Sequence, residues 1–245
     1  FEAEQGFSLA AFDYSQIELR ILASISVDEK LKKAFFENQD IHKLTASQVF
    51  NVHLDEVTPV MRQLGKTLNF GVVYGMGADA FARTAGLSRE KAENFIEEYF
   101  SDFSGVKTWQ EEMRAQARDL GYVKNLNGRR RWFLGMASPS MPAGRQVSYL
   151  QFESERAAIN MPVQGLAADI IKMAMIKTSQ LGNGVHLLLS IHDELLFEIK
   201  DDILNKTADL IKKTMEGVLK LDVPLEVAVK IGKNWGELKN ENKNK

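Results

Sequence analysis

Two kinds of hydrophobic pattern alternate along the chain. The stretch SLAAFDY at Ser8–Tyr14 is a short apolar run that predicts a buried strand. The stretch VHLLLSIHDELLFEI at Val185–Ile199 holds two apolar runs around three ionisable residues and predicts a β-hairpin. Between these stretches, apolar residues recur at helical spacing. A strand, a helical block, and then a hairpin, a helix and a strand predict an α+β fold with a small antiparallel sheet.

The helical block divides at recognisable caps. Thr58 and Pro59 begin a helix that runs to Tyr74, and Gly75 ends it. Asp40 caps a helix over residues 40–50. Further helices are predicted over residues 15–26, 28–38, 88–100, 106–120, 146–181 and 201–219, the fifth of them interrupted near Pro162 and Gly165. Residues 121–132 predict a hairpin turning at Asn127-Gly128, residues 135–144 a flexible loop, 225–231 a strand and 240–245 a frayed end.

Composition narrows the class of protein. The 245 residues allow one large domain or two small ones, and 44% hydrophobic and 26% charged residues are typical of a globular protein. No apolar run approaches the ~20 residues of a membrane span, so we expect that this chain is not a membrane protein. The absence of cysteine excludes disulfides and thiolate metal sites. The net charge of −2 means that contacts with nucleic acid must come from local basic patches.

The bend of the central hairpin lacks the usual turn residues. Tight hairpins favour Asn-Gly, Asp-Gly or Gly-X, whereas this bend reads His192, Asp193, Glu194. A second acid, Asp13, ends the first apolar run. If both runs share one sheet, Asp13 and Asp193 meet at its edge, where their charges repel unless a cation lies between them. Magnesium accepts such ligands, and two ions could support phosphoryl transfer. The alternative is a solvated acidic turn.

The helix at 59–74 carries two cations and two aromatic residues in one row. Arg62, Lys66, Phe70 and Tyr74 follow at intervals of four and therefore share a helix face. Cations at this spacing repel unless an anion lies across them, and a triphosphate would supply that anion. The aromatic rings would offer flat faces to a base or sugar. The alternative is an amphipathic helix with a solvated basic end and a buried aromatic end.

The motifs together resemble one family. The segments DYSQIELR, RQLGKTLNFGVVYG and HDE, in this order, closely resemble the three signature motifs of the A-family DNA polymerases of the bacterial DNA polymerase I type. They lie at Asp13–Arg20, Arg62–Gly75 and His192–Glu194. Further matches are DIH (Asp40–His42), GRRR (Gly128–Arg131), ERAAINMPVQGLAADIIK (Glu155–Lys172) and VPLEVAVKIGKNW (Val223–Trp235), so that the likeness covers almost the whole chain.

The resemblance implies a catalytic centre with two magnesium ions. Asp13 and Asp193 would bind both ions, the backbone carbonyl of Tyr14 would help, and Glu194 would lie close by. Lys66 is the implied proton donor to the pyrophosphate leaving group. The implied reaction is attack of a primer 3′-hydroxyl on the α-phosphorus of a dNTP.

Further implied roles concern the nucleotide and the DNA. Arg62, Lys66 and His42 would grip the triphosphate, and Glu18 would exclude a 2′-hydroxyl, which favours deoxynucleotides. Phe70 would stack on sugar and base and predicts discrimination against nucleotides without a 3′-hydroxyl; Tyr74 would occupy or leave the template-base position. The remaining implied contacts are Gln16 at the minor groove of the new pair, Arg156, Asn160 and Gln164 at primer and template, His192 at the primer terminus, and Arg129 and Arg130 of a basic patch at the DNA phosphates.

The resemblance also implies a place within a longer polymerase. Residues 1–27 would belong to the palm, 28–135 to the fingers and 136–245 to the palm again. The chain starts at Phe1, so thumb and early palm are expected upstream, and this segment alone is expected to extend primers poorly. The partners would be primer-template DNA, dNTPs and that upstream segment, in a bacterial-type, nucleoid-associated cytoplasmic enzyme. The loop at 134–147 departs from the family pattern and is assigned no role.

Three other functions remain open at this point. A metal-dependent nuclease or phosphatase could use the same two acids, but it would not need the row from Arg62 to Tyr74. A catalytically silent nucleic-acid-binding module gains nothing from acids that face a polyanion. A single-subunit RNA polymerase is related in architecture, but Glu18 and the wording of the first motif favour DNA.

Overall fold

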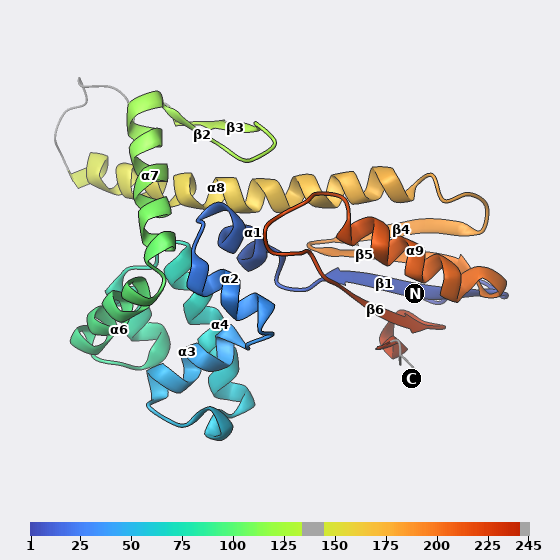
Figure 1. The fold of residues 1–245 in the computed structure, drawn as a ribbon, viewed down its shortest axis with the longest axis horizontal. Coiled ribbons are helices and arrows are strands. Elements are labelled where there is room, and N and C mark those ends of the chain that lie inside the picture. Colours follow the sequence, from blue (N-terminus) through green and yellow to red (C-terminus); the bar gives the residue numbers. More distant parts are fainter. Residues whose placement is uncertain (134–144, 241–245) are drawn as a thin grey trace. The chain divides into compact units, whose positions relative to one another are not determined.

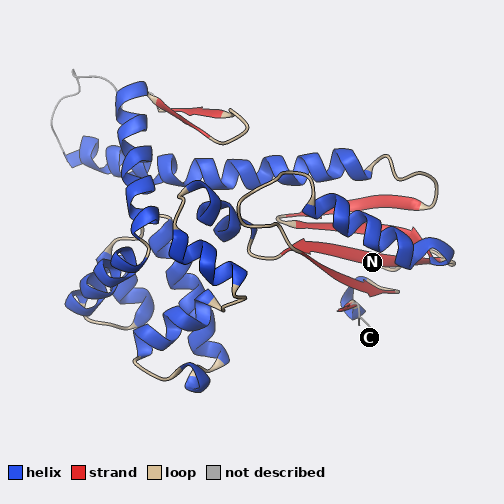
Figure 2. Ribbon diagram, in the orientation of Figure 1, coloured by secondary structure: helices blue, strands red, loops and turns tan. Residues whose placement is uncertain are grey.

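The computed structural model describes residues 1–133 and 145–240, and its side chains are described except for 145–151 and 240. The predicted loop at 135–144 therefore lies outside the described residues, as do residues 241–245. The chain forms two compact units, one of residues 1–21 and 164–245 and one of residues 22–163. In Figure 2 the strands gather in the first unit, whereas the second is helical apart from one small hairpin. The predicted α+β fold is confirmed.

The first unit is built on a five-stranded antiparallel sheet with the order β4-β5-β1-β6-β7 (Figure 1). The first strand of the chain, β1, lies in the middle of the sheet and pairs with β5 and β6, which come much later in the sequence. The strands are β1 (Phe7–Tyr14), β4 (Val185–Ile191), β5 (Glu194–Lys200), β6 (Val227–Gly232) and the short β7 (Lys239–Asn240). The predicted strands and central hairpin are confirmed; β7 was not predicted.

Both faces of the sheet bury apolar side chains. On one face, Leu9 and Ala11 pack with Leu196 in a core cluster. On the other face, Phe12 meets Phe197 edge to face, with ring centroids 5.5 Å apart. There Tyr14 donates a hydrogen bond to the carbonyl of Met215 in α9 (Leu204–Glu216), at 2.7 Å, and burial raises the pKa of its hydroxyl. α9 therefore covers the second face, as Figure 1 shows.

A buried arginine fixes the segment that follows β1. Arg20 lies in α1 (Ile17–Ile25) and is 5% exposed. Its guanidinium donates to the carbonyls of Ser15 at 2.9 Å and Pro224 at 2.8 Å, and it pairs with Glu226 at 2.6 Å. The turn after β1 is thereby held against the segment that leads into β6.

The second unit contains most of the helices, and their caps agree with the sequence. Asp28, Asp40, Thr58 and Ser88 each accept a hydrogen bond from the first turn of the helix that they precede. The elements are α2 (Glu29–Phe36), α3 (Ile41–Phe50), α4 (Pro59–Val73), α5 (Ala78–Ala85), α6 (Arg89–Asp102), α7 (Ser104–Leu120), the hairpin of β2 (Tyr122–Lys124) and β3 (Arg130–Trp132), and the first part of α8 (Arg145–Thr178). α5 was not predicted, because its first turn has no side-chain cap.

One carboxylate serves two helices at once. Asp28 accepts a hydrogen bond from the amide of Leu31 in α2, at 2.9 Å. The same carboxylate accepts from the amides of Gly105 and Val106 in the first turn of α7, at 2.9 and 3.3 Å. Helix N-termini leave their first amides without partners, and a shared anion satisfies both sets. Asp28 thus ties together two helices that are far apart in the sequence.

The predicted interruption of the long helix is wrong. α8 runs from Arg145 to Thr178 with Pro162 inside it. A proline inside a helix costs about 3 kcal/mol, because it removes one hydrogen bond and crowds the preceding turn. Several neighbouring side chains are fully buried, and the larger ones each contribute about 1.5–3 kcal/mol. Their burial offsets the proline; they are Ala158, Ile159, Val163 and Leu166. None of the described helices has the length and apolarity needed to cross a bilayer.

Candidate active site

Main-chain pairing brings two distant acids together. Asp13 lies near the end of β1, directly opposite Glu194 in β5. The amide of Tyr14 donates a hydrogen bond to the carbonyl of Asp193, at 3.1 Å. Residues directly opposite in antiparallel strands share a face, so the side chains of Asp13 and Glu194 project from the same face of the sheet. The predicted meeting of Asp13 and Asp193 at one sheet edge is confirmed for the backbone, and their roles stay predictions.

Two predicted site residues have left-handed backbone conformations next to these acids. His192, in the bend between β4 and β5, has φ of +53°, and Gln16, just after β1, also has φ of +53°. Such a conformation costs a residue other than glycine about 1–2 kcal/mol. Strain of this kind clusters at functional sites. The bend has no glycine or asparagine to adopt this conformation, so His192 adopts it and its backbone is strained.

A pocket of about 360 Å³ brings four predicted site residues together in the first unit. Glu18 of α1, Gln164 of α8, and His192 and Asp193 of the hairpin bend all line it. Part of the remaining wall is apolar and includes Ile171. The polar groups therefore converge on one concavity. Through Asp193 this concavity reaches the end of β1 and β5 that carries Asp13, Asp193 and Glu194, called the acidic edge below.

The acids at this edge offer hard oxygen ligands. Among the described residues, no group of three or more histidine, cysteine, aspartate or glutamate side chains is arranged to hold a metal by itself. Magnesium, however, is usually held by one or two carboxylates together with substrate phosphates. Asp13, Asp193 and the carbonyl of Tyr14 have the oxygen chemistry for an ion of that kind. They fit an ion that the substrate completes rather than a closed structural site.

In the second unit, α3 and α4 pack closely because one residue has no side chain. A Cβ atom at Gly65 would collide with the carbonyl oxygen of His42 and would lie 3.1 Å from the Cβ of Ala46. Gly65 is buried, and the glycine therefore admits the backbone of α3. This contact sets the separation between His42 and the row of residues on α4.

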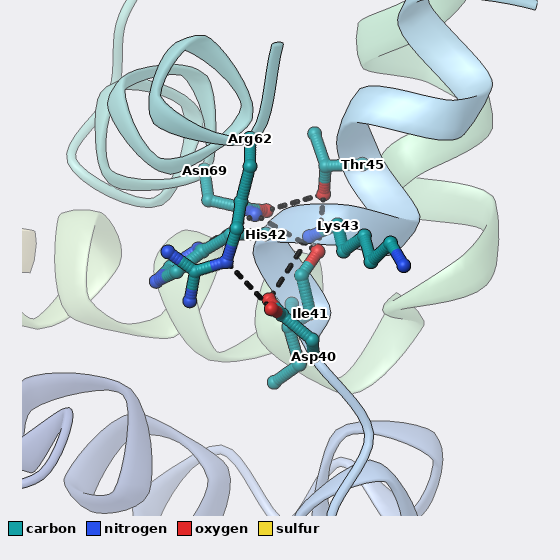
Figure 3. Close-up of polar contacts among 7 residues, drawn as sticks. All are labelled: Asp40, Ile41, His42, Lys43, Thr45, Arg62 and Asn69. Carbon is teal, nitrogen blue, oxygen red and sulfur yellow. Dashed lines mark hydrogen bonds and ion pairs between the residues drawn. The ribbon is translucent and has the colours of Figure 1, made fainter. Parts of the chain in front are cut away.

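Asp40 connects the two helices by an ion pair. One carboxylate oxygen caps α3 by accepting from the amide of Lys43, at 3.0 Å, and the other accepts from Nε of Arg62, at 2.6 Å (Figure 3). Burial raises the pKa of Asp40, but the hydrogen bonds from Arg62 and Lys43 outweigh it and hold the pKa below its ordinary value. The predicted cap is confirmed, and the ion pair with Arg62 was not predicted.

His42 is buried between the two helices and is 2% exposed. Its Nδ1 lies 3.2 Å from Nδ2 of Asn69, while Nε2 is buried and has no hydrogen-bond partner among the described residues. Burial lowers the pKa of His42 to about 4; the charges of Arg62 and Lys66 also lower it, whereas Asp40 raises it. His42 is therefore a neutral imidazole at neutral pH.

The predicted row on α4 is present in the structure. Lys66 is exposed, and further along the helix the rings of Phe70 and Tyr74 lie with centroids 6.2 Å apart. The ring of His42 extends this aromatic row, at 5.9 Å from Phe70. Two cations and two aromatic rings thus follow one another along α4, with the buried imidazole of His42 beside Phe70. This is the order that an extended molecule with an anionic and a flat end would need.

The carboxyl end of α4 is fully capped. Gly75 has φ of +78°, and the predicted stop at this glycine is confirmed. Four successive carbonyls at this end each accept from a named donor: Gly71 from the amide of Met76, Val72 from the amide of Gly75, Val73 from Nε2 of Gln110 at 2.8 Å, and Tyr74 from Nε of Arg156 at 3.4 Å. Gln110 and Asn69 were not singled out from the sequence, because a glutamine or asparagine in a helix usually faces solvent.

A second pocket of about 620 Å³ lies at this end of α4. Phe70, Tyr74 and Arg156 line it, so three further predicted site residues share one concavity. Arg83 and Arg89 also line it, together with Asp79, which pairs with Arg89 at 3.5 Å. An anionic ligand with an aromatic group fits the character of these walls.

The other predicted DNA contacts lie on different elements of the second unit. Arg129 and Arg130 are exposed on the hairpin of β2 and β3, where the guanidinium of Arg130 lies 4.7 Å from the ring centroid of Tyr122. Tyr122 in turn packs on Trp132, with ring centroids 4.8 Å apart. Asn160 is half-buried in α8, and its Oδ1 has no hydrogen-bond partner among the described residues.

Comparisons with known proteins agree on one family. The model of DNA polymerase family A matches residues 1–237. The thermostable DNA polymerase I of Thermus filiformis is 45% identical over 98% of this chain and 28% of its own length. DNA polymerase I of Bacillus subtilis is 42% identical over 97% of this chain and 27% of its own length. The chain thus spans about a quarter of the curated relatives that it matches.

A solved structure has the same fold. The POL domain of Pol1 from M. smegmatis, in complex with DNA primer-template and dNTP, superposes with a TM-score of 0.87 at 40% sequence identity. The match covers 96% of this chain and 41% of that one.

Proposed function

Because the chain belongs to DNA polymerase family A, we propose that it carries the nucleotidyl-transfer site of a DNA-templated DNA polymerase. The reaction joins a primer 3′-hydroxyl to the α-phosphorus of a dNTP and releases pyrophosphate. The pairing of β1 with β5, which brings Asp13 beside Asp193 and Glu194, is the observation that carries this proposal. Primer-template DNA, dNTPs and the rest of a longer polymerase would be the partners, in the cytoplasm and on the nucleoid.

In this proposal the acidic edge holds two magnesium ions. Asp13, Asp193 and the carbonyl of Tyr14 would be the ligands, and Glu194 would add negative charge beside them. When bound, the ions would supply activation of the hydroxyl and stabilisation of the leaving oxygen. Main-chain pairing between β1 and β5 holds this edge in place, and so do the hydrogen bonds that Arg20 donates to the carbonyls of Ser15 and Pro224.

The surface of α3 and α4 would bind the triphosphate. Arg62, Lys66 and His42 offer two charges and a neutral donor, and Lys66 is exposed and able to give a proton to pyrophosphate. The ion pair between Arg62 and Asp40 has a consequence for binding. A phosphate that binds Arg62 must compete with Asp40 for the guanidinium. Before the phosphate binds, the ion pair with Asp40 holds the guanidinium in place.

The aromatic end of the same surface would bind the nucleoside. Phe70 would stack on sugar and base, and Tyr74 would hold or leave the template-base position. Glu18 would exclude a 2′-hydroxyl, and its place in the pocket with Gln164 and His192 supports a role close to the new base pair. Gln16 would contact the minor groove of that pair. Primer and template would be contacted by Arg156, Asn160, Gln164, His192, Arg129 and Arg130.

Primer extension by the full-length protein tests the proposal. In the presence of Mg²⁺ and dNTPs, Asp13→Ala and Asp193→Ala are each expected to reduce extension by about 1,000-fold or more, since each removes charge from the reacting centre. Asp202→Ala, at an exposed acid in the same unit, is the control and is expected to keep full activity. Extension that survives both active-site changes would overturn the proposal.

The same assay separates the rival functions. A metal-dependent nuclease would shorten a labelled primer without dNTPs, and that degradation would be lost in Asp13→Ala. A catalytically silent binding module would neither extend nor shorten the primer, although it would retain the DNA.

A further inference from the structure

The two ring nitrogens of His42 have different surroundings. Nδ1 lies 3.2 Å from Nδ2 of Asn69, and Nε2 is buried without a partner among the described residues (Figure 3). A neutral imidazole has one donor nitrogen and one acceptor nitrogen, and the partner of one decides the role of the other. The orientation of the Asn69 amide therefore determines what His42 can bind through Nε2.

The carbonyl of Ile41 fixes that orientation, because it accepts a hydrogen bond from Nδ2 of Asn69, at 3.3 Å. The hydroxyl of Thr45 lies 3.0 Å from both Oδ1 of Asn69 and the same carbonyl, and its one proton can serve either of them. A backbone carbonyl can only accept, so the group that faces Ile41 must be the amide NH₂. The reversed amide would place two acceptor oxygens against each other. The same NH₂ group faces Nδ1 of His42, which must therefore accept and carry no proton.

Burial, supported by two neighbouring cations, lowers the pKa of His42 and keeps it from taking a second proton. Arg62 and Lys66 lie on the facing helix and disfavour an imidazolium, and Asp40, the acid among the described residues that favours it, is paired with Arg62. The single proton is then on Nε2. A buried N–H without a partner is rare in proteins, and the two neighbouring cations attract an anion to it.

We propose that Asn69 is a positioning residue that holds His42 as the neutral Nε2–H tautomer, with its spare donor reserved for a phosphate oxygen of the nucleotide. The inference rests on the proposed function for the identity of that anion. With the other tautomer, the Nε2 lone pair would face the phosphate oxygen and repel it. The free protein is thus prepared to add a hydrogen bond without a third positive charge between α3 and α4.

The first experiment reads the tautomer directly in the full-length protein without nucleotide. The sequence has four histidines, so ¹⁵N NMR of the imidazole nitrogens gives few signals, and His42→Ala identifies that of His42. At pH 7 we expect a protonated Nε2 and a bare Nδ1. A proton on Nδ1, or on both nitrogens, overturns the inference even if primer extension is normal. Absent primer extension would instead overturn the proposed function.

The second experiment removes the donor that faces Nδ1. Asn69→Asp keeps the size of the side chain and an acceptor for Thr45, but it can only accept at His42. We expect a proton on Nδ1 and a rise of about 10- to 100-fold in KM for dNTP, the range for a hydrogen bond to a charged group. The turnover number is expected to change much less.

Two further variants separate positioning from other effects. The carboxylate introduced by Asn69→Asp also adds charge, so the substitution is repeated in the His42→Ala background, where its effect on KM should largely vanish if it acts through His42. An undiminished effect there contradicts the inference. Thr45→Val removes a buried hydroxyl of the same network but leaves the donor at Nδ1, so we expect the tautomer unchanged and KM within about twofold. If Thr45→Val raises KM as much as Asn69→Asp, the role of Asn69 is only structural.

Discussion

The acidic edge of the sheet and the basic surface of α3 and α4 are positioned by different means. Asp13 and Asp193 are placed by main-chain pairing, which depends little on which side chains stand nearby. Arg62 and His42 are placed by side-chain partners, Asp40 and Asn69, which are themselves fixed by other hydrogen bonds. A carboxylate at the acidic edge is therefore displaced mainly by a change in its own side chain. Arg62 and His42 are displaced mainly by a change in a neighbouring side chain.

Lengthening an acid tests the first half of this comparison. In Asp13→Glu or Asp193→Glu the charge is kept, but the pairing still holds the backbone, so the carboxylate moves by about one methylene. A displacement of about 1 Å at a reacting centre can cost about 100-fold in rate. We expect a loss of that size in single-turnover primer extension by the full-length protein. Near-normal rates would show that the backbone adjusts and that the edge is not rigidly placed.

The second half of the comparison, which concerns α3 and α4, predicts that the stability of the helical unit depends on pH. The pKa of His42 is lowered to about 4 in the folded chain, below the ordinary value of 6.5. The unfolded chain therefore binds a proton first as pH falls, and stability that is full above pH 6.5 declines toward pH 4. Between pH 7.5 and 5, we expect His42 to reduce the free energy of unfolding by about 2 kcal/mol.

Urea unfolding at both pH values, for the natural protein and for His42→Gln, measures this contribution. Other groups titrate in the same range, so the difference between the two proteins is the relevant quantity. Equal losses of stability in both would contradict the assigned environment of His42.

A smaller effect is expected at the carboxyl end of α4. Gln110→Met keeps the length of the side chain but removes the donor to the carbonyl of Val73. A buried acceptor without a partner costs about 1 kcal/mol or somewhat more. Gln63→Met, at an exposed position of α4, is the matched control and is expected to be neutral. Thermal unfolding of both variants provides the measurement, and equal melting temperatures would show that the bond from Gln110 contributes nothing.

The sequence predicted those features that depend on local patterns. Strands, caps and the stop at Gly75 follow from apolar periodicity and from the chemistry of residues such as Asp40 and Thr58. It failed at Pro162, where burial of the surrounding side chains outweighs a local signal. The row from Arg62 to Tyr74 followed from helical spacing alone.

Features that depend on contacts between distant segments were not predictable in this way. The donor that caps Val73 comes from α7, and no residue near Gln110 in the sequence marks it as more than a polar position. The partner of His42 is Asn69, which helical spacing places on α4 without showing what faces it. His42 and Asn69 come into contact only because α3 packs closely against α4, and this close packing requires a glycine at position 65.

The central place of β1 in the sheet has a consequence for synthesis of the protein. β1 emerges from the ribosome well before its two neighbours in the sheet, because β5 begins at Glu194 and β6 at Val227. At about 5–20 residues per second, an apolar strand must wait roughly 10–40 s for its partners. Residues 22–163 can fold during that interval, so the nascent chain depends on protection of β1 from aggregation until β5 and β6 have been synthesised.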